Sequence, residues 1–439
     1  MKAEEIGHRR VLAIALPIVL SNATVPILGA VDTGVVGQLG EAAPIGAVGI
    51  GAIILSAIYW IFGFLRMGTV GLTSQALGRG EAPEVAALLS RALLIGLMGG
   101  LAVILLQLPL FWGAFRLAPA SPEVEALARD YMAIRIWSAP AAIALYGITG
   151  WLIAQERTRA VLVLQVWMNG LNIVLDLWFV LGLGWGVEGV AIATFLAEWS
   201  GLALGLWFCR AAFAGPDWRD VARVFDAARL RRMAAVNGDI LIRSVLLQAI
   251  FVSFLFWGAG LGDVTLAGNQ VLLQFLHITA YALDGFAFAA EAIVGQAFGA
   301  GAVAALRRGA VLTSIWGVAV SVGLALVFLV FGGAIIDVMT TAPEVRAAAR
   351  GDLVWMVIAP LAGIASWMLD GIFIGATRTR DMRNMMALSA AIYLAAALAL
   401  MPWLGNDGLW LALLISFVAR GVTLGVRYPA LERAAGPKF

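Results

Sequence analysis

The chain has 439 residues, of which 62% are hydrophobic and 13% are charged, and its formal net charge is +2. Soluble domains carry about 25% charged residues, so this composition excludes a water-soluble fold. The mean hydropathy of +0.94 indicates an integral membrane protein. The basic residues gather in no patch that would suit nucleic acid.

Apolar stretches long enough to cross a hydrocarbon core as helices recur along the whole chain. They lack the ten-residue alternation of a membrane barrel. Charged residues precede the first stretch, which has no small-residue cleavage site, so we expect a retained helix rather than a signal peptide. We predict twelve spans, at residues 11–38, 45–73, 85–113, 126–153, 159–183, 187–212, 233–259, 264–298, 306–336, 348–376, 383–404 and 407–428.

The chain repeats itself after half its length. A period of this size in a hydrophobic chain is typical of secondary transporters, whose solute site lies between related halves. The repeated pairs are Gln75-Ala76-Leu77-Gly78 with Gln296-Ala297-Phe298-Gly299, Ala139-Pro140 with Ala359-Pro360, and Arg157-Thr158-Arg159 with Arg378-Thr379-Arg380.

Six spans separate each residue from its counterpart, and an even number of crossings preserves orientation. The halves are therefore expected to be related by an axis along the membrane normal. We predict an all-α membrane fold with two parallel-repeat lobes of six helices around a central cleft. The N-terminal lobe covers residues 1–212, a cytoplasmic linker covers 213–232, and the C-terminal lobe covers 233–439.

Most arginines fall on one side of the twelve-span arrangement, although Arg116, Arg129, Arg346 and Arg350 break the pattern. The positive-inside rule places both termini and the linker in the cytoplasm.

Ionisable groups inside the spans are the first functional candidates. Each costs several kcal/mol in the bilayer, so such groups normally face a cavity or a partner. Among the ionisable residues of the predicted spans, we take as candidates Asp32, Asp176, Glu198, Arg243, Asp284, Glu291 and Asp370.

Asp32 lies late in the first span, after Pro17 and Pro26. Each proline removes a hydrogen bond within the helix and can bend it beside a titratable group. Alternatively, the prolines are tolerated as in many membrane helices, and Asp32 lies near water at the outer interface.

Asn169, Asn172 and Asp176 are spaced at i, i+3 and i+7, so they share one face of the fifth span. A carboxylate with two amides on an apolar helix can hold a cation or a proton. The alternative is a structural role, because asparagine often forms hydrogen bonds between membrane helices.

The second half carries its own polar set. Asp239 and Arg243 are spaced at i, i+4 and are expected to pair, and Asp284 and Glu291 share a face at i, i+7. With Asp370, these residues are predicted to meet in one cluster. That cluster is either a neutralised network that locks the helices or a site for substrate or protons.

The first span resembles that of multidrug and toxic compound extrusion (MATE) transporters, from Leu16-Pro17 through Ser21-Asn22 and on from Val25 to Gly37. Residues Asn169 to Asp176 and Gly186 to Thr194 look like the fifth and sixth helices of that family. The stretches Tyr281 to Phe286, with Glu291, and Leu369 to Arg378 resemble its DinF-like branch.

This resemblance implies a cation-coupled exporter of organic, often cationic and aromatic compounds. In the family, the aspartate of the first helix is the position most tied to coupling, which implies that role for Asp32. The resemblance also implies that Asn172, Asp176, Thr194 and Tyr131 surround it.

Three readings follow. The first is a proton-driven drug antiporter, or a sodium-driven one, in which Asp32 lies within hydrogen-bonding reach of Asn172, Asp176 or Thr194. The second is a flippase for lipid-linked intermediates, which would favour a basic interior. The third, a membrane enzyme, has no support, because two histidines and one cysteine offer no metal-ligand spacing.

We therefore expect a transporter with no cofactor and no metal. Its partners are small organic substrates and the lipid bilayer, with no nucleic acid. It is expected to be a monomer in the bacterial inner membrane.

Overall fold

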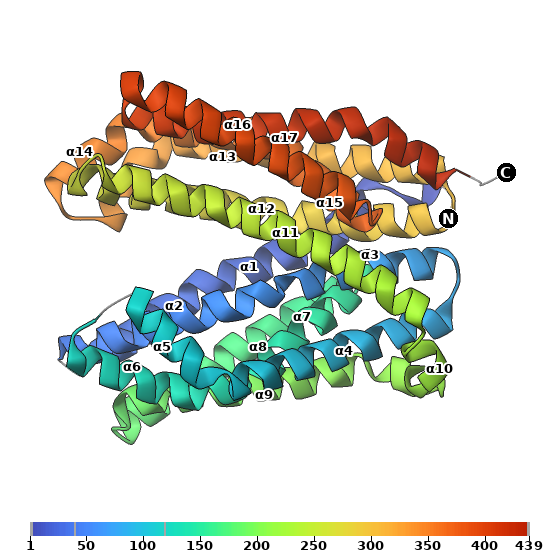
Figure 1. Ribbon diagram of the computed structural model, residues 1–439, viewed down its shortest axis with the longest axis horizontal. Helices are drawn as coiled ribbons and strands as arrows, with labels where there is room; N and C mark the ends of the chain where they lie inside the picture. The colour runs from blue at the N-terminus through green and yellow to red at the C-terminus, as the bar shows by residue number, and fades with distance from the viewer. Residues whose placement is uncertain (1–2, 39–40, 118–119, 437–439) are drawn as a thin grey trace. The chain divides into compact units, whose positions relative to one another are not determined.

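The computed structural model describes residues 3–38, 41–117 and 120–436, and within them regular structure is helical throughout (Figure 1). Twelve helical stretches of the described chain are long and apolar enough to cross a membrane. The predicted class, an all-α integral membrane fold, is thereby confirmed.

The first half contains short helical breaks within its spans. Turns of 3-10 helix at Ile61–Gly63 and Ile136–Ser138 join α2 to α3 and α6 to α7, and a π-helical turn at Leu177–Gly182 extends α8. The α-helices are α1 (His8–Gly37), α2 (Ala42–Trp60), α3 (Phe64–Gly78), α4 (Ala82–Leu105), α5 (Gln107–Leu117), α6 (Pro122–Arg135), α7 (Ala139–Ala154), α8 (Thr158–Asp176), α9 (Gly186–Phe208) and α10 (Val221–Val224).

The second half has longer unbroken helices. The eighth predicted span, which contains Asp284 and Glu291, is one continuous helix. The α-helices are α11 (Ala227–Ala259), α12 (Asp263–Gly299), α13 (Val303–Met339), α14 (Pro343–Gly351), α15 (Leu353–Gly375), α16 (Thr379–Leu404) and α17 (Asn406–Ala435).

Local sequence explains several of the helix starts. Proline occupies the first turn of α4, α6, α7 and α14, where its missing N–H would have no helical partner in any case. Ser121 caps α6 by accepting a hydrogen bond from the Val124 N–H at 3.4 Å.

The helices form two compact units. The first-half unit contains Leu20–Thr73 and Glu81–Arg231, and the second-half unit contains Met1–Val19, Ser74–Gly80 and Arg232–Phe439. The units differ from the predicted lobes at the start of α1 and the end of α3. Gln75 shows why, because its amide donates to Thr377 Oγ1 at 2.9 Å within the second-half unit.

The backbone repeats the sequence period. Glu156 and Thr377 adopt positive φ values of 59° and 50°, and each stands directly before one of the repeated Arg-Thr-Arg motifs. Few residues other than glycine take this conformation. Its recurrence at equivalent turns shows that the duplication extends to local geometry.

A close helix approach is also repeated. A Cβ on Gly150 would lie 2.4 Å from the Arg66 carbonyl oxygen, and one on Gly371 would lie 2.5 Å from that of Ala287. Only glycine allows backbones to approach so closely. The α3–α7 contact of the first-half unit thus has an α12–α15 equivalent in the second-half unit.

Candidate functional site

A row of polar side chains joins α1 to α8 within the first-half unit. Asn172 Nδ2 donates to Asp32 Oδ1 at 3.4 Å, so the expected contact between these residues is present. Farther along, Asn169 Nδ2 donates to Thr24 Oγ1 at 2.7 Å, and Gln165 Nε2 donates to Asn169 Oδ1 at 3.0 Å. The i, i+3, i+7 spacing on α8 therefore faces α1.

Asp176 completes this row. Its carboxyl group lies within hydrogen-bonding reach of that of Asp32, and its side chain is 0% exposed. Neither Asp176 oxygen accepts a hydrogen bond from an N–H or O–H donor in the described part of the chain. Two neighbouring carboxyl groups in an apolar setting disfavour double ionisation. A hydrogen bond between them requires that one carries a proton.

Arg135 lies next to this pair and was missed by the sequence reasoning. It forms an ion pair with Glu198 of α9 at 3.0 Å and donates to the Tyr131 hydroxyl oxygen at 2.8 Å. Its positive charge also acts on both Asp32 and Asp176. An arginine within the predicted span 126–153 was itself the signal, because charged groups in spans need a partner.

The remaining candidates of the first helix and its neighbours lie as follows. Tyr131 is buried and close enough to Asp32 for their charges to interact. Thr194 Oγ1 donates to the carbonyl of Val190 in its own helix at 3.1 Å instead of to Asp32. The helix α1 is continuous through Pro17 and Pro26, so bending at the prolines stays a prediction.

Buried charges of the second-half unit pair across different helices. Arg243 of α11 forms an ion pair with Asp370 of α15, and Arg420 of α17 approaches the same carboxylate at 3.7 Å. All three side chains are buried. Arg420, which also donates to Ser366 Oγ at 2.9 Å, was absent from the sequence-derived set.

The predicted pairing of Asp239 with Arg243 is corrected by the structure. Asp239 instead accepts from Arg383 at 2.6 Å and from Thr379 at 3.1 Å, both in the first turns of α16. Because Arg243 pairs with Asp370, the two residues belong to different ion pairs.

Glu291 and Asp284 lie on α12. Glu291 is buried where the α12 backbone approaches Gly375, and Asp284 is half-buried. Their membership of one cluster with Asp370 stays a prediction. Within the described residues, no group of three His, Cys, Asp or Glu side chains is placed to hold a metal ion.

A duplicated bundle of membrane-spanning helices with a buried polar site defines a class of membrane transporters. The family model MatE matches residues 17–178 and 240–400, so the chain belongs to the MATE family of transporters.

The chain is also similar to individual members. It is 41% identical to DNA damage-inducible protein F of Escherichia coli, over 94% of this chain and 90% of that protein. It is 23% identical to multidrug resistance protein MdtK of Edwardsiella ictaluri, over 97% and 96% of the two chains.

Solved structures share the fold. The Vibrio cholerae MATE transporter VcmN in the bent form has a TM-score of 0.87 at 21% identity, covering 98% of this chain and 97% of that one. A MATE structure in the straight conformation has a TM-score of 0.87 at 17% identity, with 97% of each chain covered.

Proposed function

We propose that the protein is a proton-driven antiporter that exports organic compounds, in particular cationic and aromatic ones. The observation that carries this proposal is the contact between Asp32 and Asp176, a carboxyl pair inside membrane-spanning helices with Asn172 donating to it. Such a pair can hold one proton between two acceptors and release it when the surroundings change.

The neighbouring ion pair supports this role. Arg135 is held by Glu198 and Tyr131, so its positive charge lies beside the carboxyl pair without entering it. Protonation of the pair would weaken its attraction to Arg135 and rearrange the Asp32–Asn172 hydrogen bond. Only such a difference between states can couple two fluxes.

The coupling of proton to substrate would act through α1. Bent and straight forms exist among the MATE structures that share this fold. In our proposal, protonation bends α1 near Pro26 and shrinks the space that holds the drug, and proton release restores it. Proline favours such a bend because it removes one helical hydrogen bond.

A second candidate is a sodium-driven exporter of the same class. Asn172 Oδ1 and both carboxyl oxygens of Asp176 accept no hydrogen bond from described donors. In a state where Asp32 and Asp176 share no proton, these three oxygens could bind a hard cation. The nearby Arg135 charge disfavours a sodium ion in the same place, so we rank this candidate second.

The proposal includes the oligomeric state of the protein, its membrane and its orientation in that membrane. The protein would act as a monomer in the bacterial inner membrane, with both termini cytoplasmic and no cofactor. Its substrates would be small organic molecules that enter from the cytoplasm or the bilayer.

The experiment is export of a fluorescent organic cation in proteoliposomes, under an imposed proton gradient or an imposed sodium gradient. Asp32→Asn and Asp176→Asn keep the side-chain shape and remove the ability to titrate. The matched control is Asp130→Asn, an exposed aspartate of α6 in the same unit.

We expect a proton gradient to drive export by the wild type and by Asp130→Asn, and both site variants to lose most of it. Export by Asp32→Asn at the wild-type rate would overturn the proposal. Export that follows only the sodium gradient would favour the second candidate.

A further inference from the structure

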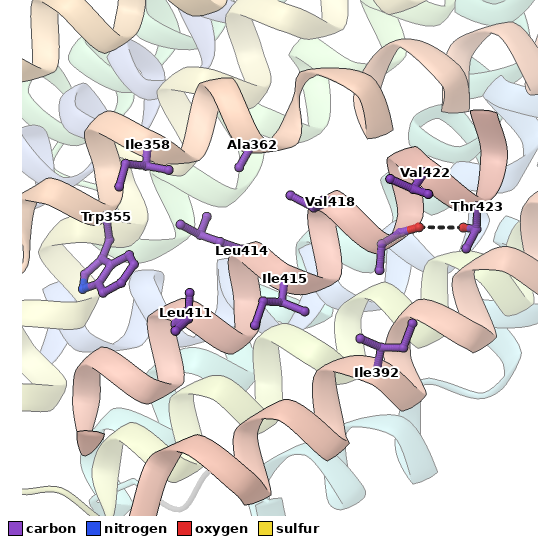
Figure 2. A pocket seen from close by; sticks show the side chains of 11 residues that line it. Trp355, Ile358, Ala362, Ile392, Leu411, Leu414, Ile415, Val418, Val422 and Thr423 are labelled. Atoms are coloured by element: carbon purple, nitrogen blue, oxygen red, sulfur yellow. Dashed lines mark hydrogen bonds between the residues drawn. The ribbon is translucent and has the colours of Figure 1, made fainter. Parts of the chain in front are cut away.

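An apolar groove lies on the second-half unit. Its volume is 570 Å³, and residues of α15, α16 and α17 line it. Figure 2 shows Trp355 at one end, Val422 and Thr423 at the other, and Leu414, Ile415 and Val418 between them. All of these helices are long and apolar enough to span a membrane.

The groove offers no polar group to an occupant. The Thr423 hydroxyl donates to the Ala419 carbonyl in its own helix at 2.8 Å, and Trp355 Nε1 donates to Asp407 at 2.8 Å. The aliphatic chains of Ile358, Val418 and Val422 remain 40%, 46% and 59% exposed. An occupant must therefore be apolar along this length, because buried polar groups need partners.

The length of the groove matches one leaflet of a bilayer. Its lining on α17 runs from Leu411 to Thr423, which corresponds to roughly 18 Å of helix at 1.5 Å per residue. Half of a hydrocarbon core is about 15 Å. A single acyl chain would extend from one end of the groove to the other.

A free positive charge lies just past the Thr423 end. Arg427 is one helical turn farther along α17, is exposed, and has no ion-pair or hydrogen-bond partner within the described residues. Arginine binds phosphate oxygens through two parallel hydrogen bonds. The organic cations proposed as substrates would be repelled at this place, whereas a phosphate would be attracted.

We infer that this groove binds one acyl chain of an anionic bilayer phospholipid, with the phosphate of that lipid at Arg427. The acyl chain moves from one apolar environment to another, so close packing in the groove and the charge of Arg427 would hold the lipid rather than removal of methylenes from water. The positive charge of Arg427 attracts a headgroup of net negative charge more strongly than a zwitterionic one. The site is separate from the Asp32–Asp176 pair and does not depend on the proposed transport activity.

The test uses the purified full chain in nanodiscs that contain phosphatidylglycerol with a photoreactive diazirine on its acyl chain. After illumination, peptide mass spectrometry locates the labelled residues. Val330 is an apolar residue of α13 that is 68% exposed, and its labelling measures the background on an ordinary apolar surface.

Two variants address the two parts of the site. Ala362→Phe places a large ring in the groove that Ala362 lines, and Val330→Phe is its matched control on α13. Arg427→Gln removes the charge beside the Thr423 end. Size-exclusion chromatography checks that each variant remains a single folded species.

We expect labelling at Ile358, Ile392 and Val418 to exceed that at Val330, and Ala362→Phe to reduce it to the Val330 level. Arg427→Gln should lower groove labelling by about fivefold, the effect of one basic residue at an anionic lipid surface. If the groove residues of the wild type were labelled no more than Val330, the inference would be overturned before any variant was tested. Groove labelling that an organic cation displaces would also overturn it, because the occupant would then be a substrate.

Discussion

The two halves of the molecule share a backbone pattern but carry their buried charges at different positions. Counting from the repeated Arg-Thr-Arg motif, Asn172 corresponds to Tyr393, and Asp176 corresponds to Ala397. Tyr393 and Ala397 lie in the apolar core of the second-half unit, where they are 2% and 0% exposed. The place of Asp176 in one unit is thus filled by a packed alanine in the other, and no carboxyl group stands at either mapped position.

The same exchange holds for the surrounding residues. Gly186 and Gly405 stand at the equivalent turns where α9 and α17 begin, and counting from them Glu198 corresponds to Phe417. Counting from the repeated Ala-Pro motif, Arg135 corresponds to Trp355. Phe417 belongs to the apolar core and Trp355 packs against it. Duplication preserved the helices, which need only apolar length and close-packed glycines, while ion pairing could be lost in one copy and kept in the other.

The largest effect is expected from placing a carboxylate at the second-half position that corresponds to Asp176. Ala397→Asp puts an acidic group into a packed hydrophobic cluster, and the penalty for such a buried charge is several kcal/mol. We expect the variant to lose most of its folded protein, measured by the thermal transition of the protein in detergent.

The reciprocal change serves as the control. Asp176→Ala removes a carboxyl group that has no N–H or O–H donor, so the folded protein should survive and export should be lost. If Ala397→Asp melted within about 1 kcal/mol of the wild type, the second-half core would not be the apolar counterpart described above.

The next largest effect concerns the buried ion pairs of the second-half unit. Asp370→Asn leaves the two buried guanidinium groups of Arg243 and Arg420 without their carboxylate, and breaking such a pair costs about 3–5 kcal/mol. Asp239→Asn should cost less, because its partner Arg383 keeps 30% of its side chain in contact with solvent. Thermal melting compares the two. Equal losses of stability in the two variants would show that burial does not set the strength of these ion pairs.

A smaller effect is expected in the row of amides. Asn169 corresponds to Ala390 in the second half, so Asn169→Ala recreates the apolar copy at one position. The lost hydrogen bonds to Thr24 and Gln165 should cost about 0.6 kcal/mol each, the average for membrane helices. Melting should shift only slightly, while drug export is measured in parallel. A loss of several kcal/mol would assign Asn169 to fold stability rather than to the site.

Sequence reasoning found the parts of this picture that depend on helical periodicity. The spacing of Asn169, Asn172 and Asp176 fixed a single face of α8, and the cost of a charge in lipid predicted that Asp32 would have a polar neighbour. Both statements concern one helix at a time. The fold class followed from apolar length and from the sequence repeat in the same way.

Partners on distant helices were harder to predict. Asp239 has Arg243 one turn away, yet it pairs with Arg383, which lies 144 residues farther along the chain. The i, i+4 spacing is compatible with an Asp239–Arg243 pair, but the approach of α16 to α11 brings Arg383 to Asp239 instead. Arg135 and Arg420 were missed, although both lie within predicted spans and the cost of a charge there applies to a guanidinium group as much as to a carboxylate.

The smallest expected effect concerns Cys209, which directly follows α9 in the first-half unit and is 0% exposed. Burial raises the pKa of its thiol to about 12, whereas an exposed cysteine has a pKa of about 8.5. The thiolate is the reactive form, and a raised pKa keeps the thiol protonated until the pH approaches that value. Maleimide labelling of native Cys209 should therefore be slow throughout about pH 7 to 9, because only a very small fraction of this thiol is ionised there. In a Cys209→Ser, Ala214→Cys variant, the exposed reporter at position 214 should label quickly and faster as the pH rises.

Labelling of the two thiols at equal rates would mean that the end of α9 opens to solvent. The first-half unit would then be loosely packed at this end as well as polar within, and its contrast with the second-half core would concern packing as much as charge.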